Sequence, residues 1–393
     1  MEEAGTVRAE VKRIEIPPQR TLERSLPRDY YVSREHFVLE RERIFMREWF
    51  CVAREEEIPS PGDYLVLDVA GESILVTRTK SGELRAFYNV CRHRGSQLKW
   101  DEPARCRSEG PAEVRPTGSM EANRIRCPYH AWTYGLEGDL RGAPFLPGAF
   151  DRADFPLYPV GIETWGGFVF LNLTQGEAGG LSDQLGPIPQ RVGNYSLDGL
   201  GVAARIVYRV RANWKVILEN YNECYHCGTV HPELCEVVPA FAEAGGANLD
   251  WDEGIPHREG AYTFTFTGTS DRSPFPGLSE AERSRHKGEL AYPNLMLSLS
   301  PDHVAAFTLW PDGSNDTTIV CDWLFHPSEM RRNGFDPSDA VEFWDLVNRQ
   351  DWRICESVQR GMESRAFETG YLAPMEDLNL DIRRYLEDKL AGS

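Results

Sequence analysis

Two short motifs each place one cysteine beside one histidine: Cys91-Arg-His93 and Cys127-Pro-Tyr-His130. Thiolates and neutral imidazoles are metal ligands, and two kinds of centre use two of each. Zinc takes them in tetrahedral geometry, and a [2Fe–2S] cluster can be held by two Cys on one iron and two His on the other. Zinc fingers usually pair Cys with Cys and His with His. One of each per loop therefore favours the binuclear cluster, with a zinc-stabilised binding protein without redox activity as the alternative.

A second group of metal-binding residue types lies at 213–231. Residues 213–226 are predicted to form an amphipathic helix. Its apolar face would hold Trp214, Ile217, Leu218, Tyr221 and Tyr225, and its opposite side Glu219, Glu223 and His226. Gly228 can end this helix and Pro232 fixes the chain after it. We therefore expect His231 to turn back towards His226.

Two histidines and one carboxylate form the facial triad of non-haem Fe(II) oxygenases, which leaves positions open for O2 and substrate. In this interpretation His226 and His231 supply the pair. Cys224 and Cys227 also form a C-x-x-C motif, so zinc binding with His231 or a redox pair is the alternative. We expect both cysteines to be buried, unoxidised thiols.

The third ligand is expected on a long helix at about 340–363. Its apolar stripe would hold Trp344, Val347, Ile354, Cys355 and Val358. Asp351 lies in the middle of that stripe, where a carboxylate is costly unless it is paired or bound to a metal. We predict Asp351 as the ligand and rank Glu356 second, because Glu356 lies off the stripe. A salt-bridged core aspartate is the alternative.

The elements that position these residues indicate an α+β fold. Short β runs separated by turns predict a small all-β domain at 45–165, inserted into an α+β domain formed by 1–44 and 166–393. The α+β domain is expected to have an antiparallel sheet with flanking helices. Its predicted strands are 207–211, 261–268, 295–299, 304–310 and 317–325. Asp336-Pro-Ser-Asp is a capping signal before the long helix.

Composition limits the class of protein. The 393 residues carry a net charge of −18, which argues against nucleic-acid and anionic-membrane partners. No stretch approaches the roughly 18 apolar residues that span a bilayer, and the charged N-terminus lacks the apolar core of a signal peptide. We therefore expect a cytoplasmic protein, in which nine cysteines indicate metal ligation or buried thiols.

The two Cys/His loops, Cys91–Gly95 and Cys127–Trp132, resemble the ligand loops of Rieske proteins. Segments 213–231 and 350–360 are similar to the catalytic domain of Rieske non-haem iron oxygenase α subunits. This resemblance, from about Tyr30 to Glu363, implies two cofactors. Its implied cluster ligands are Cys91, His93, Cys127 and His130, and its implied ligands of a mononuclear Fe(II) are His226, His231 and Asp351.

The resemblance also implies roles and partners. Glu223 matches the family's bridging carboxylate, which hydrogen-bonds ligand histidines of both centres across a subunit boundary. Glu223 and Asp351 are thus the expected catalytic carboxylates. A homotrimer or a multiple of it and a separate NAD(P)H-dependent reductase are implied. The interval from His93 to Cys127 is longer than is usual in the family, so 101–123 is interpreted as an insertion, in which Cys106 has no assigned role.

Within the family, the chain is most similar to the branch acting on quaternary ammonium compounds such as glycine betaine, carnitine and stachydrine. The implied reaction is O2-dependent hydroxylation that leads to N-demethylation. A trimethylammonium group favours aromatic faces. The candidate aromatics are Trp251, Tyr262, Phe264, Phe266, Tyr292, Phe307, Trp310 and Trp323. An aromatic-ring-hydroxylating or O-demethylating oxygenase is the alternative. A protein that only carries electrons is a less suitable interpretation, because it would not need the second group of metal ligands, His226, His231 and Asp351.

Overall fold

The computed structural model describes residues 22–390, apart from 100–116, 148–149, 175–177 and 248. Most of the predicted N-terminal arm and of the 101–123 insertion, including Cys106, lies outside the described residues. The end of the insertion forms β6 (Thr117–Ser119), which pairs with β3 (Asp63–Val69). The strand β1 (Glu23–Pro27) pairs with β18 (Thr369–Leu372) and so joins the two ends of the described chain.

The N-terminal lobe is all-β. Its seven-stranded sheet has the order β2-β11-β10-β5-β4-β3-β6, and a three-stranded sheet has the order β7-β8-β9. The further bounds are β2 Phe50–Arg54, β4 Glu72–Arg78, β5 Leu84–Tyr88, β7 Ile125–Arg126, β8 Thr133–Tyr134, β9 Leu140–Gly142, β10 Pro159–Trp165 and β11 Phe168–Asn172. The β3–β4 hairpin turns at Ala70 and Gly71, whose φ values of 55° and 84° match the twist of the strands.

The C-terminal lobe is built on a six-stranded antiparallel sheet with the order β12-β17-β16-β15-β14-β13. Its strands are β12 Gly201–Val210, β13 Ile255–Pro256, β14 Arg285–Ala291, β15 Leu295–Leu299, β16 Val304–Pro311 and β17 Thr317–Phe325. The strand predicted at 261–268 was wrong, because this segment forms turns. Thr265 and Thr267 there donate to the Thr269 carbonyl, and such local bonds compete with a sheet ladder.

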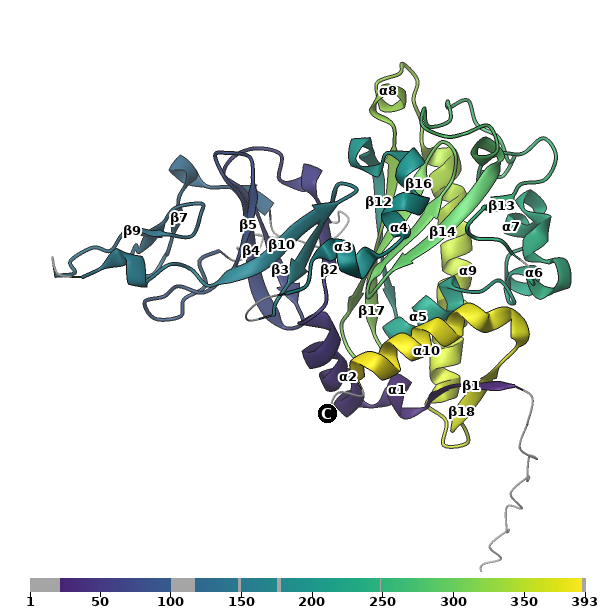
Figure 1. Cartoon of the computed structure of the whole chain (residues 1–393), viewed down its shortest axis with the longest axis horizontal. Helices are drawn as coiled ribbons and strands as arrows, with labels where there is room; N and C mark the ends of the chain where they lie inside the picture. Colours follow the sequence, from purple (N-terminus) through teal and green to yellow (C-terminus); the bar gives the residue numbers. More distant parts are fainter. Residues whose placement is uncertain (1–21, 100–116, 148–149, 175–177, 248, 391–393) are drawn as a thin grey trace, which may run out of the picture.

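Helices surround this sheet (Figure 1). Their bounds are α1 Asp29–Val32, α2 Arg34–Glu40, α3 Leu181–Leu185, α4 Ile188–Arg191, α5 Trp214–Tyr221, α6 Cys227–Val230, α7 Pro232–Val237, α8 Pro327–Met330, α9 Ser338–Met362 and α10 Asp377–Leu390. Helix α9 confirms the predicted long helix. The helix predicted to continue to His226 was wrong in its end, because α5 stops at Tyr221. None of the described helices is both long enough and apolar enough to cross a membrane.

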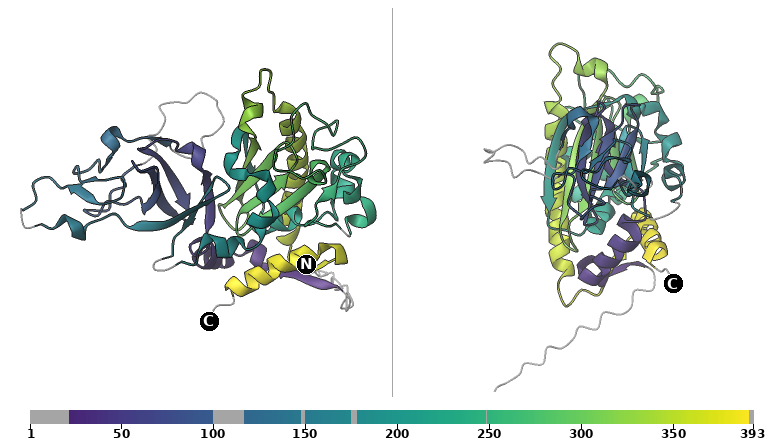
Figure 2. Two further views of the ribbon diagram at one scale, coloured as in Figure 1. Left: turned by 45° about the horizontal axis from the view of Figure 1, so that its top comes forward. Right: turned by 90° about the vertical axis from the view of Figure 1, so that its left-hand side faces the viewer.

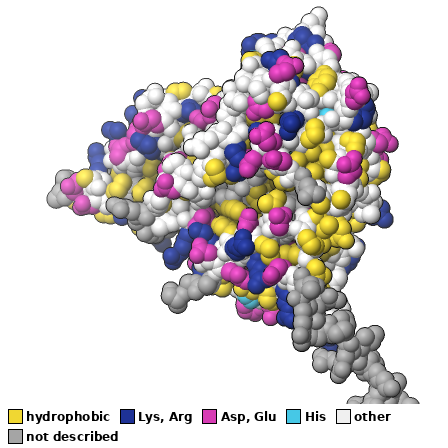
Figure 3. All heavy atoms as spheres, turned by 45° about the vertical axis from the view of Figure 1, so that its right-hand side comes forward, with side chains coloured by type: hydrophobic (Ala, Val, Ile, Leu, Met, Phe, Trp, Pro, Cys, Tyr) yellow, Lys and Arg dark blue, Asp and Glu magenta, His cyan; other side chains and the backbone are white. Residues whose placement is uncertain are grey.

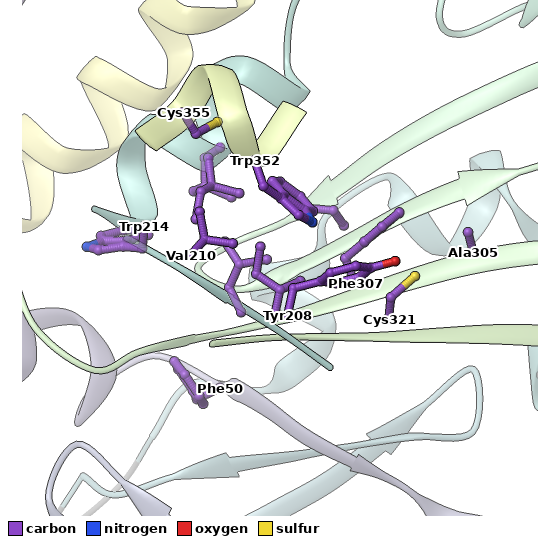
Figure 4. Packing of buried hydrophobic residues seen from close by; sticks show 14 of the residues in the cluster. Phe50, Tyr208, Val210, Trp214, Ala305, Phe307, Cys321, Trp352 and Cys355 are labelled. Carbon is purple, nitrogen blue, oxygen red and sulfur yellow. The ribbon is translucent and has the colours of Figure 1, made fainter. Parts of the chain in front are cut away.

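The core joins α5 and α9 to the sheet. Trp214 of α5 and Trp352 of α9 pack with Tyr208 of β12 and Phe307 of β16 (Figure 4). These side chains are between 0% and 9% exposed. This packing fixes α9 against α5, and the residues that follow α5 are thereby held near the middle of α9.

The two lobes lie side by side (Figure 2), and two side-chain amides connect them, the buried Asn294 and the partly buried Gln184. Asn294 accepts from Cys51 N at 2.9 Å and donates to Cys51 O at 2.8 Å. Gln184 likewise accepts from Trp49 N at 2.7 Å and donates to Trp49 O at 2.8 Å. Each amide thus bonds both backbone groups of one residue in or next to β2. The architecture confirms the α+β prediction, with a small β domain beside an antiparallel sheet and its helices.

Candidate metal centres

The first cysteine–histidine motif lies in a closed loop after β5. Cys91 N donates to Ser96 O at 2.8 Å, and Gly95 N donates to Cys91 O at 3.0 Å. Gly95 has a φ of 73°, a left-handed conformation that glycine adopts without a steric cost. The loop therefore fixes the backbone on both sides of His93.

The second motif closes in the same way between β7 and β8. Cys127 N donates to Trp132 O at 2.8 Å, and Ala131 N donates to Cys127 O at 3.1 Å. Ala131 takes the left-handed position here, with a φ of 58°. The two loops thus present His93 and His130 in similar backbone settings, although the motifs differ by one residue.

The structure brings the two loops together. The imidazole rings of His93 and His130 lie 4.7 Å apart between centroids, and His93 stacks on Trp132 at 5.0 Å. The thiols of Cys91 and Cys127 are buried and interact with each other, whereas both imidazoles are exposed. The four donors therefore form one group, with its sulfur atoms inside and its nitrogen atoms at the surface.

This donor set fits a [2Fe–2S] cluster. Both cysteines are free thiols, and neither histidine lies on a helix as it would in a zinc finger. The Tyr134 hydroxyl lies 3.4 Å from Cys91 Sγ and accepts from Arg92 N at 3.2 Å. Burial raises the pKa of the Cys91 thiol, and the Tyr134 hydrogen bond opposes that rise. Tyr134 thus offers a donor to a sulfur ligand, and the sequence interpretation missed it.

The second group forms where the chain leaves α5. One nitrogen or oxygen atom from each of His226, His231 and Asp351 lies within 4.8 Å of the others, the one such group of His, Cys, Asp and Glu found in the described part of the chain. Asp351 Oδ1 lies 2.8 Å from His231 Nε2 and 3.3 Å from His226 Nε2. Two imidazoles and one carboxylate converging in this way fit a 2-His-1-carboxylate iron site.

A turn rather than a helix places His226. Glu223 Oε2 accepts from the backbone N–H groups of Tyr225 and His226, so the carboxylate caps this turn. Tyr225 consequently points away from the core and is 52% exposed, which corrects its predicted place on the apolar face. Glu219 is also not beside His226, because its carboxylate accepts from the Tyr31 hydroxyl at 2.6 Å.

Outer contacts orient both imidazoles. Glu223 Oε1 lies 2.6 Å from His226 Nδ1, and Gln350 Oε1 lies 2.8 Å from His231 Nδ1. Each Nδ1–H can donate to its oxygen, which directs the Nε2 atom of both rings towards Asp351. Glu356, the second candidate for the third ligand, instead accepts from Arg211 N at 3.2 Å. Gln350 was not singled out from the sequence, although it precedes Asp351.

Hydrogen bonds and opposite charges connect these side chains. Burial lowers the pKa of His226, but hydrogen bonds to Asp351, Cys227 and Glu223 outweigh it and raise that pKa to about 12. Burial raises the pKa of Asp351, but its hydrogen bonds to His226 and His231 outweigh burial and hold that pKa below the ordinary value. A metal ion would replace the protons that now neutralise the carboxylate.

The three residues line a cavity of about 650 Å³ in the C-terminal lobe. This volume suits a small-molecule substrate. Three of the predicted aromatics, Trp251, Phe264 and Tyr292, line it. The other five, Tyr262, Phe266, Phe307, Trp310 and Trp323, are not among its lining residues. Tyr221, Phe241 and Trp344 also line it and were not predicted to do so. The cavity wall thus contains several aromatic side chains together with the His/His/Asp group.

The two cysteines that line this cavity, Cys224 and Cys227, do not form a disulfide. Cys224 and Cys227 are both free and buried, as expected from the sequence. Cys227 Sγ lies 4.0 Å from His226 Nε2 and thus beside the metal-binding group rather than in a zinc site of its own.

The two metal-binding groups of one chain lie at opposite ends of the molecule, since β7 and β9 are far from α6 and α7 (Figure 1).

Comparisons with known proteins give one matching domain family for each of the two metal-binding groups. Residues 48–159 match the Rieske [2Fe–2S] domain family, and residues 197–392 match the catalytic domain of the ring-hydroxylating alpha subunit. The chain is 30% identical over 377 residues to the glycine betaine monooxygenase oxygenase subunit of Pseudomonas aeruginosa, covering 88% of this chain and 84% of the relative. It is 33% identical over 352 residues to the carnitine monooxygenase oxygenase subunit of Acinetobacter pittii, covering 87% and 86%.

The chain is also similar to solved structures of Rieske oxygenases. The quaternary ammonium Rieske monooxygenase CntA in complex with γ-butyrobetaine superposes with a TM-score of 0.71 at 29% identity, covering 94% of this chain and 96% of that one. Naphthalene 1,2-dioxygenase from a Rhodococcus species shares the fold, with a TM-score of 0.69 at 22% identity.

Proposed function

Since the chain belongs to the family of ring-hydroxylating oxygenase alpha subunits with a Rieske [2Fe–2S] domain, we propose that it N-demethylates a small quaternary ammonium compound with O2. The protein is an oxidoreductase, and its cofactors are the Rieske cluster and a mononuclear iron. Members of the family act together with a reductase. The relatives named for glycine betaine and carnitine support the choice of substrate class.

Specific residues are proposed to hold the two cofactors. Cys91 and Cys127 would bind one iron of the cluster, and His93 and His130 the other. His226, His231 and Asp351 would bind the mononuclear iron. When bound, the cluster supplies electron transfer and the mononuclear iron supplies O2 activation.

The chain's own residues would organise the reaction. Glu223 and Gln350 hold the His226 and His231 rings in the orientation that exposes Nε2. Aromatic faces in the cavity attract a trimethylammonium group without needing hydrogen bonds. Hydroxylation of one N-methyl carbon gives an N-hydroxymethyl ammonium product, whose C–N bond breaks to release formaldehyde, a tertiary amine and a proton. O2, two electrons and two protons balance this step, with one oxygen atom leaving as water.

The single observation that carries the proposal is the His/His/Asp group in the wall of an aromatic cavity. The test supplies the purified chain with a reductase, NADH and O2, and measures formaldehyde. Release of formaldehyde with a quaternary ammonium compound supports the proposal. Hydroxylation or O-demethylation of an aromatic acid, with no formaldehyde from the ammonium compound, would assign the chain to the aromatic branch instead.

We further propose a homotrimer, or a multiple of it, with electron transfer between neighbouring chains. The Cys/His group and the His/His/Asp group lie at opposite ends of one chain, and the imidazoles of His93 and His130 are exposed. A neighbouring chain could bring that exposed end close to Glu223, which already contacts His226. Light scattering of the native protein tests this assembly, and a monomer with full activity would contradict it.

A cytoplasmic location is proposed on the state of the cysteines. Cys224 and Cys227 are buried neighbours, and both are free thiols rather than a disulfide. Free thiols are typical of a reducing compartment.

A further inference from the structure

The cavity has very little positive charge of its own. Among its described lining residues, Arg191 is the only lysine or arginine. The acidic side chains in the same wall are Glu223, Asp250, Asp252, Glu289, Asp351 and Asp381. On the outer face of this lobe that Figure 3 shows, by contrast, Asp and Glu are interspersed with Lys and Arg. A substrate entering the cavity therefore meets an excess of negative charge.

The single cation is already neutralised by the protein. Arg191 Nε donates to Glu289 Oε1 at 2.7 Å, and a second guanidinium nitrogen donates to Glu289 Oε2. Asp252 adds a third acidic oxygen, 3.8 Å from Arg191 Nε. The Glu289 side chain is 5% exposed, so this bidentate pair is shielded from water on one side. The Glu289 carboxylate thus occupies the Nε edge of the guanidinium and matches its charge, so Arg191 offers a second carboxylate no uncompensated positive charge.

His286 does not replace the missing charge. His286 lines the cavity and is 4% exposed. Burial lowers its pKa well below the ordinary value, so its imidazole is neutral. With iron bound, His226 and His231 would be neutral ligands, and the two charges of a ferrous ion would be matched by Asp351 and Glu223. The negative excess then comes from Asp250, Asp252, Glu289 and Asp381 against Arg191.

We infer that the cavity selects a quaternary ammonium substrate with a net positive charge, such as an alcohol or an ester, over a zwitterion that carries a carboxylate. This inference rests on the proposed function and narrows its substrate class. The ammonium group would lie against aromatic faces from the group Phe241, Trp251, Phe264 and Trp344. A substrate carboxylate would be placed near Glu289 and Asp252 without a free cation, and burying such an unpaired charge is costly.

The test compares two ligands that differ only in this charge. Glycine betaine is a zwitterion, and its methyl ester is a cation with the same skeleton. Binding of each to the purified holoprotein is measured by isothermal titration calorimetry at low salt without O2. We expect the ester to bind at least roughly tenfold more tightly, since several acidic groups act on the same ligand charge. Choline serves as a second cation and should follow the ester.

Two variants test the residues. Glu289→Gln leaves Arg191 with only Asp252, so affinity for glycine betaine should rise and affinity for the ester should fall, shifting their ratio at least roughly tenfold. Asp252→Asn should shift the affinity ratio in the same direction but by less, because the Asp252 side chain is 83% exposed. The same exposure means that this substitution does not threaten folding. Glu83→Gln removes an acid that pairs with Arg85 at 2.8 Å in the other lobe, and should leave the ratio unchanged.

The outcomes separate the inference from the proposed function. Glycine betaine binding as tightly as the ester, or a ratio that neither cavity variant shifts, would overturn the inference while formaldehyde release still supported N-demethylation. Binding of an aromatic acid with no binding of either ammonium ligand would overturn both. Tighter binding of the ester, reduced in both cavity variants and unchanged in Glu83→Gln, is the expected result.

Discussion

Replacing Asp351 with alanine should remove the mononuclear iron and leave the cluster in place. Asp351 Oδ1 lies 2.8 Å from His231 Nε2 and 3.3 Å from His226 Nε2, so its loss takes away one of three converging donors. The Rieske-type ligands lie at the other end of the molecule and do not depend on this side chain.

The size of the effect follows from the ligand count. Removing an outer partner of a metal ligand costs about 10–100-fold in metal affinity. Loss of a direct ligand should therefore exceed roughly 100-fold, which corresponds to about 2.7 kcal/mol. A site weakened this much will lose its metal during gel filtration. N-demethylation should fall with it, because no second described carboxylate joins His226 and His231 in such a group.

The assay is iron content per chain together with the visible spectrum of the cluster. The native protein should hold about three irons and Asp351→Ala about two, with an unchanged spectrum. Glu356→Ala is the matched control, because Glu356 lies on the same helix and accepts from Arg211 N at 3.2 Å. An Asp351→Ala protein with full iron content and full turnover would refute the assignment.

Three further predictions concern groups around the two centres. Burial raises the pKa of Glu219 from 4.5 to about 7. The native fold should therefore lose up to about 3 kcal/mol as pH rises from 4.5 through 7, and thermal unfolding of Glu219→Gln at pH 5 and 8 should lack this decline. Tyr134→Phe removes the hydroxyl beside Cys91 Sγ, so redox titration should give a lower reduction potential for the cluster. Gln350→Ala removes the acceptor of His231 Nδ1 and should weaken iron binding by about 10–100-fold in a chelator competition. An unchanged pH profile, potential or iron affinity would contradict the corresponding prediction.

The sequence predicted those parts of the site that depend on local spacing. Cys91 and His93, or Cys127 and His130, are held by loops of a few residues, so residue type and interval indicate the ligands. Strands β15 and β17 were predicted with their observed bounds, because continuous apolar runs are buried on both faces of this sheet. Asp351 was found because a carboxylate interrupts an apolar helix face.

Other parts depended on tertiary contacts that a pattern does not contain. The helix was extended to His226 because the apolar period continues to Tyr225. The observed turn arises from the Glu223 carboxylate, which caps the Tyr225 and His226 N–H groups. Phe241 lies in an irregular segment without a periodic signal, and its place in the cavity depends on packing with Trp251 and Phe264. The neutralisation of Arg191 by Glu289 joins residues 98 positions apart and had no signal in the sequence.

The central claim is that this one chain holds both a [2Fe–2S] cluster and a separate mononuclear iron. Iron, zinc and acid-labile sulfide content, measured with a low-temperature EPR spectrum of the dithionite-reduced protein, tests it most directly. The account predicts about three irons and two sulfides per chain, with the signal of a cluster that has two histidine ligands. One zinc per chain without sulfide would contradict it and leave a structural metal protein in its place.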